Sequence, residues 1–387
     1  MSKKIKRLYL FLTLKLLFPW QYRRFRKLPL KKWKAVFIEA NLTQLSGSLR
    51  FLYQVLCSEE EMEVSVHYLM ESGNKWKFIQ NAMACLKDCA DAHYIFLNDV
   101  CNITSCIPLR KESKIFQLWH ACGAFKKFGM STSDLIFGDS RKNQEKFPYY
   151  RNQTYVTISS PEISWAYEEA MDLKGTDTQI VATGISRTDV FYDKDFIKKA
   201  KETVYSVCPQ TRGKKIILYA PTFRGRVVKA EGPDQLNIQA MMDSLGDEYI
   251  LLIKHHPFVK KRPDIPDECK DFALDISEKL EIDQLLCSSD ICISDYSSLV
   301  FEYSLFERPM IFFAYDLDDY FDWRGFYYDY GELTPGPVVA ETEAIIDYIK
   351  NLDTRFDKAK VHAFREKFMS ACDGHATDRI MDLVHNC

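Results

Sequence analysis

The chain has 387 residues, of which 47% are hydrophobic, enough to bury large cores in about two domains. Its formal net charge of −2 excludes the strongly basic class of nucleic-acid-binding proteins. The 12 cysteines include no Cys-x-x-Cys pair, which argues against a zinc site and indicates a reducing cytoplasm.

Residues 1–34 form a basic segment with no acidic residue between Lys3 and Lys34. It contains an apolar run from Leu8 to Trp20, too short to cross a bilayer, which takes roughly 20 apolar residues. Positive charge resumes after this run without a small-residue cleavage site, unlike in a signal peptide. We predict an amphipathic helix that rests on an anionic cytoplasmic leaflet. The alternative is a basic solvated arm packed on its own domain.

Residues 35–210 are predicted to form a first α/β domain, because short apolar runs alternate with helical patterns. Strands are predicted at 35–38, 64–69, 93–97, 115–119, 155–160 and 180–184, and helices at 46–56, 76–92 and 164–171. The alternation implies a parallel sheet, in which ligands bind at the carboxyl ends of the strands.

His120 closes one of these predicted strands and begins a short loop that contains Gly123, Lys126 and Lys127. A histidine at this place is suited to proton transfer near an anionic substrate. A structural histidine bonded to a backbone carbonyl fits the same pattern, so both interpretations stay open.

The strand at 180–184 leads into Arg187 and Asp189. Arg187 is suited to bind a phosphate, and Asp189 could either hold Arg187 or cap a helix. A second α/β domain is predicted for residues 211–387, with the option that its last helix crosses back to the first domain.

Three strands of the second domain are followed by polar residues. These are Thr222 with Arg224, His255 with His256, and Ser297 with Ser298. Because such strand ends point at one crevice, we predict a phosphate-rich ligand such as a nucleotide diphosphate, with simple helix capping as the alternative for the serines. The chain has neither a P-loop nor a G-x-G-x-x-G motif. Asp316 and Asp318 could hold a divalent ion, but their aromatic, loop-like surroundings lead us to predict no metal and no cofactor.

Seven motifs occur in order along most of the chain: Gln117–His120, Thr183–Asp189, Leu218–Arg224, His256-Pro257, Ser294–Ser298 with Phe301–Tyr303, Arg308-Pro309 and Asp322–Phe326. Each motif is weak alone, but seven in order are specific. Together they resemble the CDP-glycerol glycerophosphotransferases of teichoic acid synthesis. The chain length favours a compact, primase-like or capsule-type member.

The resemblance implies a GT-B fold, with two doubly wound parallel-sheet domains that face a cleft. The first domain would bind the acceptor and the second the CDP-linked donor. In that family the histidine of the Trp-His motif is the proposed base, which here is His120. The groups that bind the donor pyrophosphate correspond to His256, Ser297 and Ser298, and donor binding does not depend on a metal held by an Asp-x-Asp motif.

The implied reaction transfers glycerol phosphate or ribitol phosphate from CDP-glycerol or CDP-ribitol to a hydroxyl of an undecaprenyl-diphosphate-linked acceptor, and CMP leaves. Arg224, with Thr222 beside it, would stabilise charge on the phosphates, and helical spacing suggests that Glu302 holds the ribose hydroxyls. The enzyme would work peripherally, on the cytoplasmic face of the membrane. Two alternatives remain: a GT-B glycosyltransferase, which would release a nucleoside diphosphate from a nucleotide sugar, and a non-catalytic membrane-associated scaffold.

Overall fold

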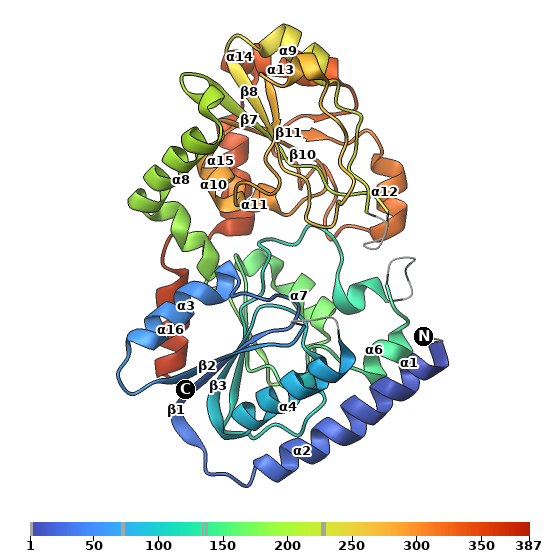
Figure 1. Ribbon diagram of the computed structural model, residues 1–387, viewed down its shortest axis with the longest axis vertical. Helices are drawn as coiled ribbons and strands as arrows, with labels where there is room; N and C mark the ends of the chain where they lie inside the picture. The colour runs from blue at the N-terminus through green and yellow to red at the C-terminus, as the bar shows by residue number, and fades with distance from the viewer. Residues whose placement is uncertain (1–2, 71–73, 134, 136–137, 226–229) are drawn as a thin grey trace. The chain divides into compact units, whose positions relative to one another are not determined.

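The computed structural model describes residues 3–70, 74–133, 135, 138–225 and 230–387. The chain forms two units, each built around a six-stranded parallel sheet (Figure 1). Unit 1 comprises residues 1–121, 127–189 and 371–387, and unit 2 comprises residues 122–126 and 190–370. The predicted pair of doubly wound α/β domains is therefore confirmed.

The sheet of unit 1 has the strand order β2-β1-β3-β4-β5-β6. Its strands are β1 (Lys31–Glu39), β2 (Glu63–Tyr68), β3 (Ala92–Leu97), β4 (Lys114–Gln117), β5 (Tyr155–Thr157) and β6 (Gln179–Val181). Its helices include α3 (Gly47–Ser58), α4 (Lys75–Asp91), α5 (Asn102–Ser105), α6 (Arg141–Lys146), α7 (Ser164–Met171) and α16 (Ala376–His385). Helices α3 and α16 pack together over one face of the sheet, where Leu52 and Ile380 are fully buried.

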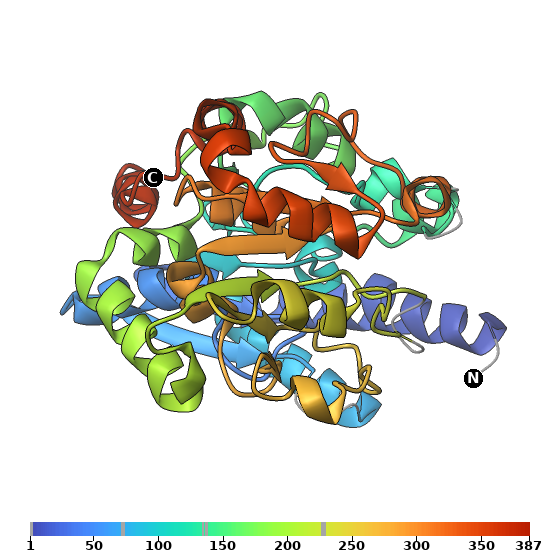
Figure 2. The same cartoon turned by 90° about the horizontal axis from the view of Figure 1, so that it is seen from above.

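The N-terminal segment forms one continuous helix along unit 1 (Figures 1 and 2). It consists of α1 (Lys3–Leu10), the π-helical η1 (Phe11–Leu17) and α2 (Phe18–Phe25). One side of this helix belongs to the core, because Leu14, Phe18 and Tyr22 are buried against residues of α4. The helix is thus anchored to its own domain by an apolar stripe.

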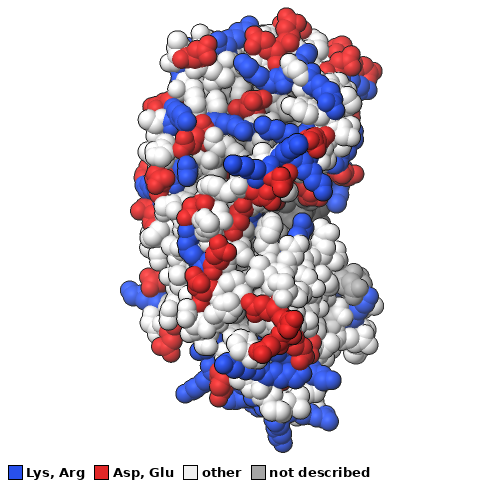
Figure 3. Space-filling view, turned by 90° about the vertical axis from the view of Figure 1, so that its left-hand side faces the viewer, with Lys and Arg blue, Asp and Glu red and all other residues white. Residues whose placement is uncertain are grey.

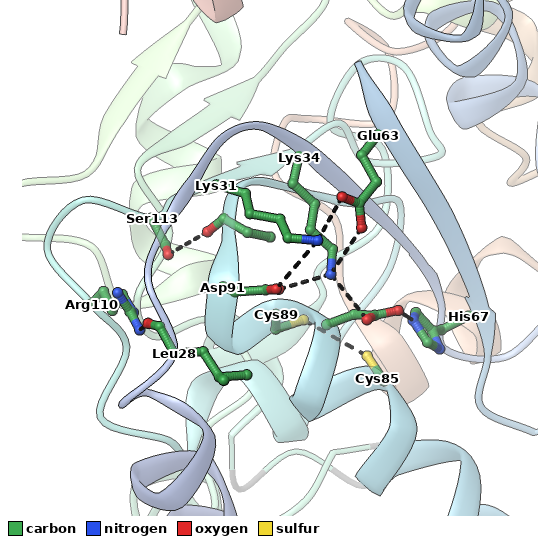
Figure 4. A network of polar contacts seen from close by, with 12 residues as sticks. Leu28, Lys31, Lys34, Glu63, His67, Cys85, Cys89, Asp91, Arg110 and Ser113 are labelled. Atoms are coloured by element: carbon green, nitrogen blue, oxygen red, sulfur yellow. Dashed lines mark hydrogen bonds and ion pairs between the residues drawn. The ribbon is translucent and has the colours of Figure 1, made fainter. Parts of the chain in front are cut away.

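Ion pairs tie β1, β2 and α4 together inside unit 1 (Figure 4). The Lys34 ammonium, at the buried end of a side chain only 4% exposed, lies 2.7 Å from the Asp91 carboxylate and 3.0 Å from that of Asp88. The other oxygen of Asp88 lies 2.8 Å from His67 Nε2. The hydrogen bond from His67, followed by that from Lys34, holds the pKa of Asp88 well below its usual range. With Glu63 at 3.5 Å as a third partner, the buried cation is matched by three carboxylates, as a charge at this depth requires.

The sheet of unit 2 has the strand order β12-β11-β10-β7-β8-β9. Its strands are β7 (Lys215–Tyr219), β8 (Tyr249–Ile253), β9 (Ala273–Asp275), β10 (Ile291–Ser294), β11 (Met310–Phe313) and β12 (Val338–Val339). Its helices are α8 (Lys194–Val207), α9 (Ile238–Leu245), α10 (Ile282–Ser288), α11 (Leu299–Ser304), α12 (Leu317–Arg324), α13 (Thr342–Lys350), α14 (Leu352–Arg355) and α15 (Lys358–Met369). Because the chain order reverses between β7 and β10, their carboxyl ends form the switch point at which ligands bind in such sheets.

Tertiary packing decides where the chain passes from one unit to the other. Helix α8 packs against α10 and so belongs to unit 2, which begins at Val190 rather than near residue 211. Helix α15 packs on α11 and stays in unit 2, whereas α16 packs on α3 in unit 1. No helix in the described part of the chain combines the length and apolar character needed to cross a bilayer.

Candidate active site

His120 lies just beyond β4, at the carboxyl edge of the unit 1 sheet, and its side chain is exposed. The preceding residue, Trp119, has a φ of 57°, in the left-handed region that large side chains seldom adopt. The two rings contact each other with their centroids 4.5 Å apart and their planes tilted by 31°. The turn at Trp119 and the contact between the two rings therefore fix the direction in which the imidazole leaves the backbone.

The hydrogen bond of His120 selects its tautomer. The ring nitrogen Nδ1 lies 3.0 Å from the carbonyl oxygen of Asn98, which follows β3. A carbonyl can only accept, so Nδ1 carries the proton and the neutral ring keeps its lone pair on Nε2. The backbone contact expected of a structural histidine is thus also the contact that prepares this ring to take a proton from a hydroxyl.

Arg187 and Asp189 follow β6, near the same edge of unit 1, but their side chains have different contacts. Arg187 packs against the start of α3, where a Cβ added to Gly47 would meet its side chain at 3.3 Å. Asp189 accepts hydrogen bonds from the backbone N–H groups of Ala376 at 3.0 Å and Thr377 at 2.7 Å. Asp189 therefore caps the start of α16, one of the two roles open from the sequence.

Arg224 follows β7 in unit 2, and its guanidinium is held by two carboxylates. Asp316 accepts from Nε at 2.5 Å and from Nη2 at 2.8 Å, and Nη1 donates to Asp295 at 2.9 Å and to the Thr222 carbonyl at 2.6 Å. Burial alone would lower the pKa of Arg224, but the charges of Asp295 and Asp316 outweigh it and raise that pKa. The side chain therefore links the loops that follow β7, β10 and β11.

These contacts limit what Arg224 and Asp316 can bind. Four of the five guanidinium N–H groups have protein acceptors, and within the described residues only one Nη2 hydrogen is left for a ligand. Asp316 also accepts from the Tyr296 hydroxyl at 2.9 Å, so its two oxygens are bonded to Arg224 and Tyr296 rather than available to a metal ion. Over the same residues, no group of three or more His, Cys, Asp and Glu side chains is arranged to hold a metal ion.

His256 follows β8 and presents a neutral hydrogen-bond donor. The Phe258 N–H donates to its Nδ1 at 3.2 Å, so Nε2 carries the proton. The ring is packed between Phe223 and Phe258, at centroid distances of 5.0 and 4.5 Å. Desolvation by these neighbours and, second, the charge of Lys126 lower the pKa of His256 to about 4. At neutral pH this ring can therefore donate to an anion through Nε2 without being charged.

Ser297 and Ser298 lie at the end of β10, half-buried, in the turn before α11. Ser297 Oγ accepts weakly from the Leu299 N–H at 3.4 Å. Thr222, after the neighbouring strand β7, is 7% exposed, and its hydroxyl has no hydrogen-bond partner among the described residues. Unit 2 thus brings hydroxyls from two adjacent strand ends to the same edge as Arg224, as the sequence predicts.

Glu302 is placed differently from the other candidates. It lies inside α11 with only 1% of its surface exposed, so its carboxylate does not reach the surface at which His256 and Ser298 lie. The sequence did not single out Asn98, which orients His120, or Asp295, which holds Arg224. Each is recognisable in the sequence only as a polar residue after a buried strand. That pattern is too common to select a residue until the order of the strands in the sheet is known.

A sequence model of the family described as CDP-glycerol:poly(glycerophosphate) glycerophosphotransferase matches residues 20–386. The chain belongs to this glycerophosphotransferase family. A teichoic acid poly(ribitol-phosphate) polymerase of Bacillus spizizenii is 38% identical over 95% of this chain and 58% of its own length. A teichoic acid ribitol-phosphate primase of the same species is 32% identical over 92% of each chain. The chain thus spans little more than half of the polymerase and nearly all of the primase.

Solved structures share the fold of this chain. A variant of the wall teichoic acid polymerase TagF aligns with a TM-score of 0.78 and 21% identity, over 99% of this chain and 96% of that one. A UDP-GlcNAc 2-epimerase from Neisseria meningitidis aligns with a TM-score of 0.54 and 11% identity, over 92% and 100%. The GT-B-like fold implied by the sequence motifs is confirmed.

Proposed function

We propose that this chain transfers glycerol phosphate or ribitol phosphate from CDP-glycerol or CDP-ribitol to a hydroxyl of an undecaprenyl-diphosphate-linked acceptor, in teichoic acid or related polymer synthesis. The acceptor oxygen attacks the β-phosphorus, the bond from that phosphorus to the bridging oxygen breaks, and CMP leaves with that oxygen. Membership of the glycerophosphotransferase family supports the donor class. The names of the relatives support both polyol phosphates.

His120 acts as the general base in this proposal. Its Nδ1–H is bonded to the Asn98 carbonyl, so Nε2 can take the proton of the acceptor hydroxyl as the new bond forms. Such proton transfer typically contributes about 10²–10⁴-fold to the rate. This tautomer is the observation that carries the proposal, because it gives the histidine a defined chemical role at the edge of its sheet.

The donor phosphates are assigned to unit 2. His256 Nε2–H, the hydroxyls of Ser297 and Ser298 and the remaining Nη2 hydrogen of Arg224 would donate to the phosphate oxygens. A neutral histidine and hydroxyls bind the pyrophosphate through hydrogen bonds. Lys126 supplies positive charge, because the charge of Arg224 is offset by Asp295 and Asp316. Glu302 is left out of this set because of its burial.

The test measures CMP release from CDP-glycerol and from CDP-ribitol, with and without a lipid-linked disaccharide acceptor. We expect acceptor-dependent release from one of the two donors, reduced at least 100-fold in His120→Asn. His120→Asn should still bind CDP in calorimetry, because the donor groups lie in unit 2. Release of a nucleoside diphosphate from a nucleotide sugar would instead establish a glycosyltransferase. Absence of any acceptor-dependent release by the folded protein would refute the proposal.

We further propose that the N-terminal helix rests on the cytoplasmic face of the membrane, beside the lipid-linked acceptor. Its outward side carries Ile5, Leu8, Leu12, Leu16 and Trp20, each between 48% and 58% exposed. A π-helical turn takes more residues than an α-helical turn, so η1 helps to keep side chains four residues apart on one line. An exposed apolar stripe of this kind is typical of an interface with lipid or protein.

The charges around this stripe favour an anionic lipid surface. Exposed basic side chains flank it at both ends: Lys4, Lys6, Arg7, Arg23, Arg24, Arg26, Lys27, Lys31 and Lys32. Lys and Arg gather at the lower end of the view in Figure 3, the end at which α2 lies in Figure 1. Each such residue near an anionic leaflet contributes about 1 kcal/mol of attraction. Peripheral attachment therefore combines an apolar contact with a polybasic one.

A further inference from the structure

Gln117, the last residue of β4, uses both ends of its amide although its side chain is completely buried. Its Oε1 accepts from the backbone N–H of Trp119 at 3.3 Å, and its Nε2 donates to the carbonyl oxygen of Asp99 at 3.1 Å. A buried amide that is bonded at both ends holds two backbone segments at a fixed separation. In this protein both segments lead to His120.

The first segment is the turn that carries His120. Trp119 needs its left-handed conformation to reverse the chain after β4, and the bond from Gln117 Oε1 to its N–H supports that conformation. The Trp119 indole is in turn packed between His120 and Phe128, at centroid distances of 4.5 and 4.9 Å. The direction of the imidazole therefore depends on a turn that Gln117 stabilises.

The second segment is the turn that carries the hydrogen-bond acceptor of His120. Asn98 supplies the carbonyl oxygen for Nδ1, and the next carbonyl, that of Asp99, accepts from Gln117 Nε2. The Asp99 carboxylate also accepts from the Asn41 amide at 2.7 Å, which fixes the other side of the turn. The contacts thus close a ring that runs from Gln117 through Trp119, His120, Asn98 and Asp99 back to Gln117.

We propose that Gln117 is the positioning residue of the general base: without touching substrate, it holds the Trp119 turn and the Asn98 carbonyl so that His120 keeps its lone pair on Nε2. This inference rests on the proposed function, because it assigns Gln117 to the base of that reaction. A glutamine that only stabilises the sheet edge would affect unfolding, but not the tautomer of His120.

The first experiment compares Gln117→Met with a matched control, Gln153→Met. Gln153 is a second buried glutamine of unit 1, 6% exposed, and neither end of its amide has a hydrogen-bond partner in the described part of the chain. We expect Gln117→Met to lower kcat by about 10- to 100-fold, as loss of a supporting hydrogen bond does elsewhere. The KM for the CDP-linked donor should stay within twofold, and Gln153→Met should leave both constants unchanged.

The second experiment reads the tautomer directly. In the full chain labelled with ¹⁵N-histidine, the ring signals of His120 are assigned by their absence in His120→Asn. Wild type and Gln153→Met should show protonated Nδ1 at neutral pH, and Gln117→Met should shift His120 toward protonated Nε2. Gln117→Glu is a second variant in case Gln117→Met does not fold. It keeps an oxygen for the Trp119 N–H but loses the donor to Asp99, and it should show an intermediate shift.

The two readouts separate the possible outcomes. An unchanged Nδ1–H signal in a folded Gln117→Met protein would overturn the positioning role, whatever its kcat. A shifted tautomer together with lower kcat and unchanged KM would establish it. Because the tautomer is measured without turnover, failure of wild type to release CMP would refute the proposed function alone, and the ¹⁵N signals would still decide whether Gln117 orients His120.

Discussion

Arg224 illustrates how a single side chain can serve a binding site by holding other residues. Its planar guanidinium donates two parallel N–H groups to Asp316 and a third to Asp295. It therefore joins the segments that follow three strands of the sheet. The aromatic rings of Tyr296 and Tyr320 lie 5.2 and 5.4 Å from its central carbon. These contacts help to fix the position of the loop that carries Ser297 and Ser298.

Replacing Arg224 by lysine should therefore weaken donor binding although the charge is kept. A lysine cannot make the paired bonds to Asp316, so we expect a free energy of unfolding about 2 kcal/mol lower and a roughly 10-fold higher KM for CDP-glycerol. Chemical denaturation and steady-state kinetics measure the two quantities. Arg212→Lys, at an exposed site in the same unit, should change neither. A wild-type KM in Arg224→Lys would contradict this positioning role.

Removing the Ser298 hydroxyl tests direct contact with the donor. Hydrogen bonds to a charged phosphate contribute about 1.5–3 kcal/mol, so Ser298→Ala should raise the Kd for CDP by about 10- to 100-fold in calorimetry. Ser288→Ala is the control, because Ser288 donates only to the Gln284 carbonyl of its own helix. Equal CDP affinities for Ser298→Ala and wild type would remove Ser298 from the donor site.

The sequence selects candidate site residues more readily than it predicts their partners. His120, His256 and Ser298 lie shortly after the ends of apolar strands, so local pattern and motif suffice to select them as candidates. Arg224, by contrast, is paired with Asp295 and Asp316, which lie 71 and 92 positions further along the chain. Asp189 caps a helix 187 positions away. No local pattern encodes such distances, since they depend on the order in which strands join the sheet.

At the scale of elements, the N-terminal helix has two apolar sides in different surroundings. Its inner side, with Leu14 and Phe18, is buried in unit 1, and its outer side is exposed. The sequence shows the apolar run and the flanking charges, but which side chains face inward depends on the packing against α4 and on the π-helical turn. The basic segment also continues into β1, where Lys34 becomes buried rather than solvated.

A charge on the outer side should detach this helix from lipid without unfolding the protein. Leu12→Glu places a carboxylate where a half-exposed leucine stood, so we expect at least 10-fold weaker binding to vesicles that contain phosphatidylglycerol in a sedimentation assay. Val207→Glu, at a similarly exposed apolar site of unit 2, should bind like wild type. Wild-type affinity of Leu12→Glu would show that lipid contact occurs elsewhere. Binding should also weaken as salt rises.

For the whole molecule, the Lys34 network predicts how stability responds to pH. The native pKa of Asp88 is lowered, so its contribution is present above the unfolded pKa of about 3.9 and is lost as pH falls below it. Burial alone would lower the pKa of Lys34, but hydrogen bonds to Asp91 and Asp88 raise it. That contribution is present below the unfolded pKa of about 10.4 and is lost as pH rises through the native value.

Lys34→Met should therefore be most destabilising near neutral pH. It removes the cation 2.7 Å from Asp91 and leaves that carboxylate to the more distant Lys31, at 3.9 Å, so we expect a cost of up to about 3–5 kcal/mol, as in comparable buried pairs. The deficit in free energy of unfolding relative to wild type should shrink as pH falls below about 4, where the carboxylates of the unfolded chain become protonated and wild type loses the stability that Lys34 contributes. Denaturation curves at pH 7 and pH 3.5 measure this. Lys215→Met, at an exposed pair in unit 2, should show little deficit at either pH, and a pH-independent deficit of Lys34→Met would contradict the assignment.

The doubly wound architecture is predictable because alternating apolar runs and helical patterns leave few other arrangements. The path of the chain between the two units is not, because it depends on which surfaces pack. The lysine-rich sequence of α8 is typical of a solvated helix, yet one side of α8 packs on α10. The apolar spacing of α16 does not say which unit it joins, and its packing against α3 places it in unit 1.

Because residues 371–387 return to unit 1, this unit cannot be completed until the end of synthesis. At about 5–20 residues per second, roughly 10–40 seconds pass on the ribosome between the completion of β6 and the arrival of α16. During that time the apolar surface of Leu49, Leu52 and Leu56 lacks the cover that Ile380 and Val384 later provide. The second half of the chain can thus finish folding before the first, and the nascent first half is the part most exposed to aggregation during synthesis.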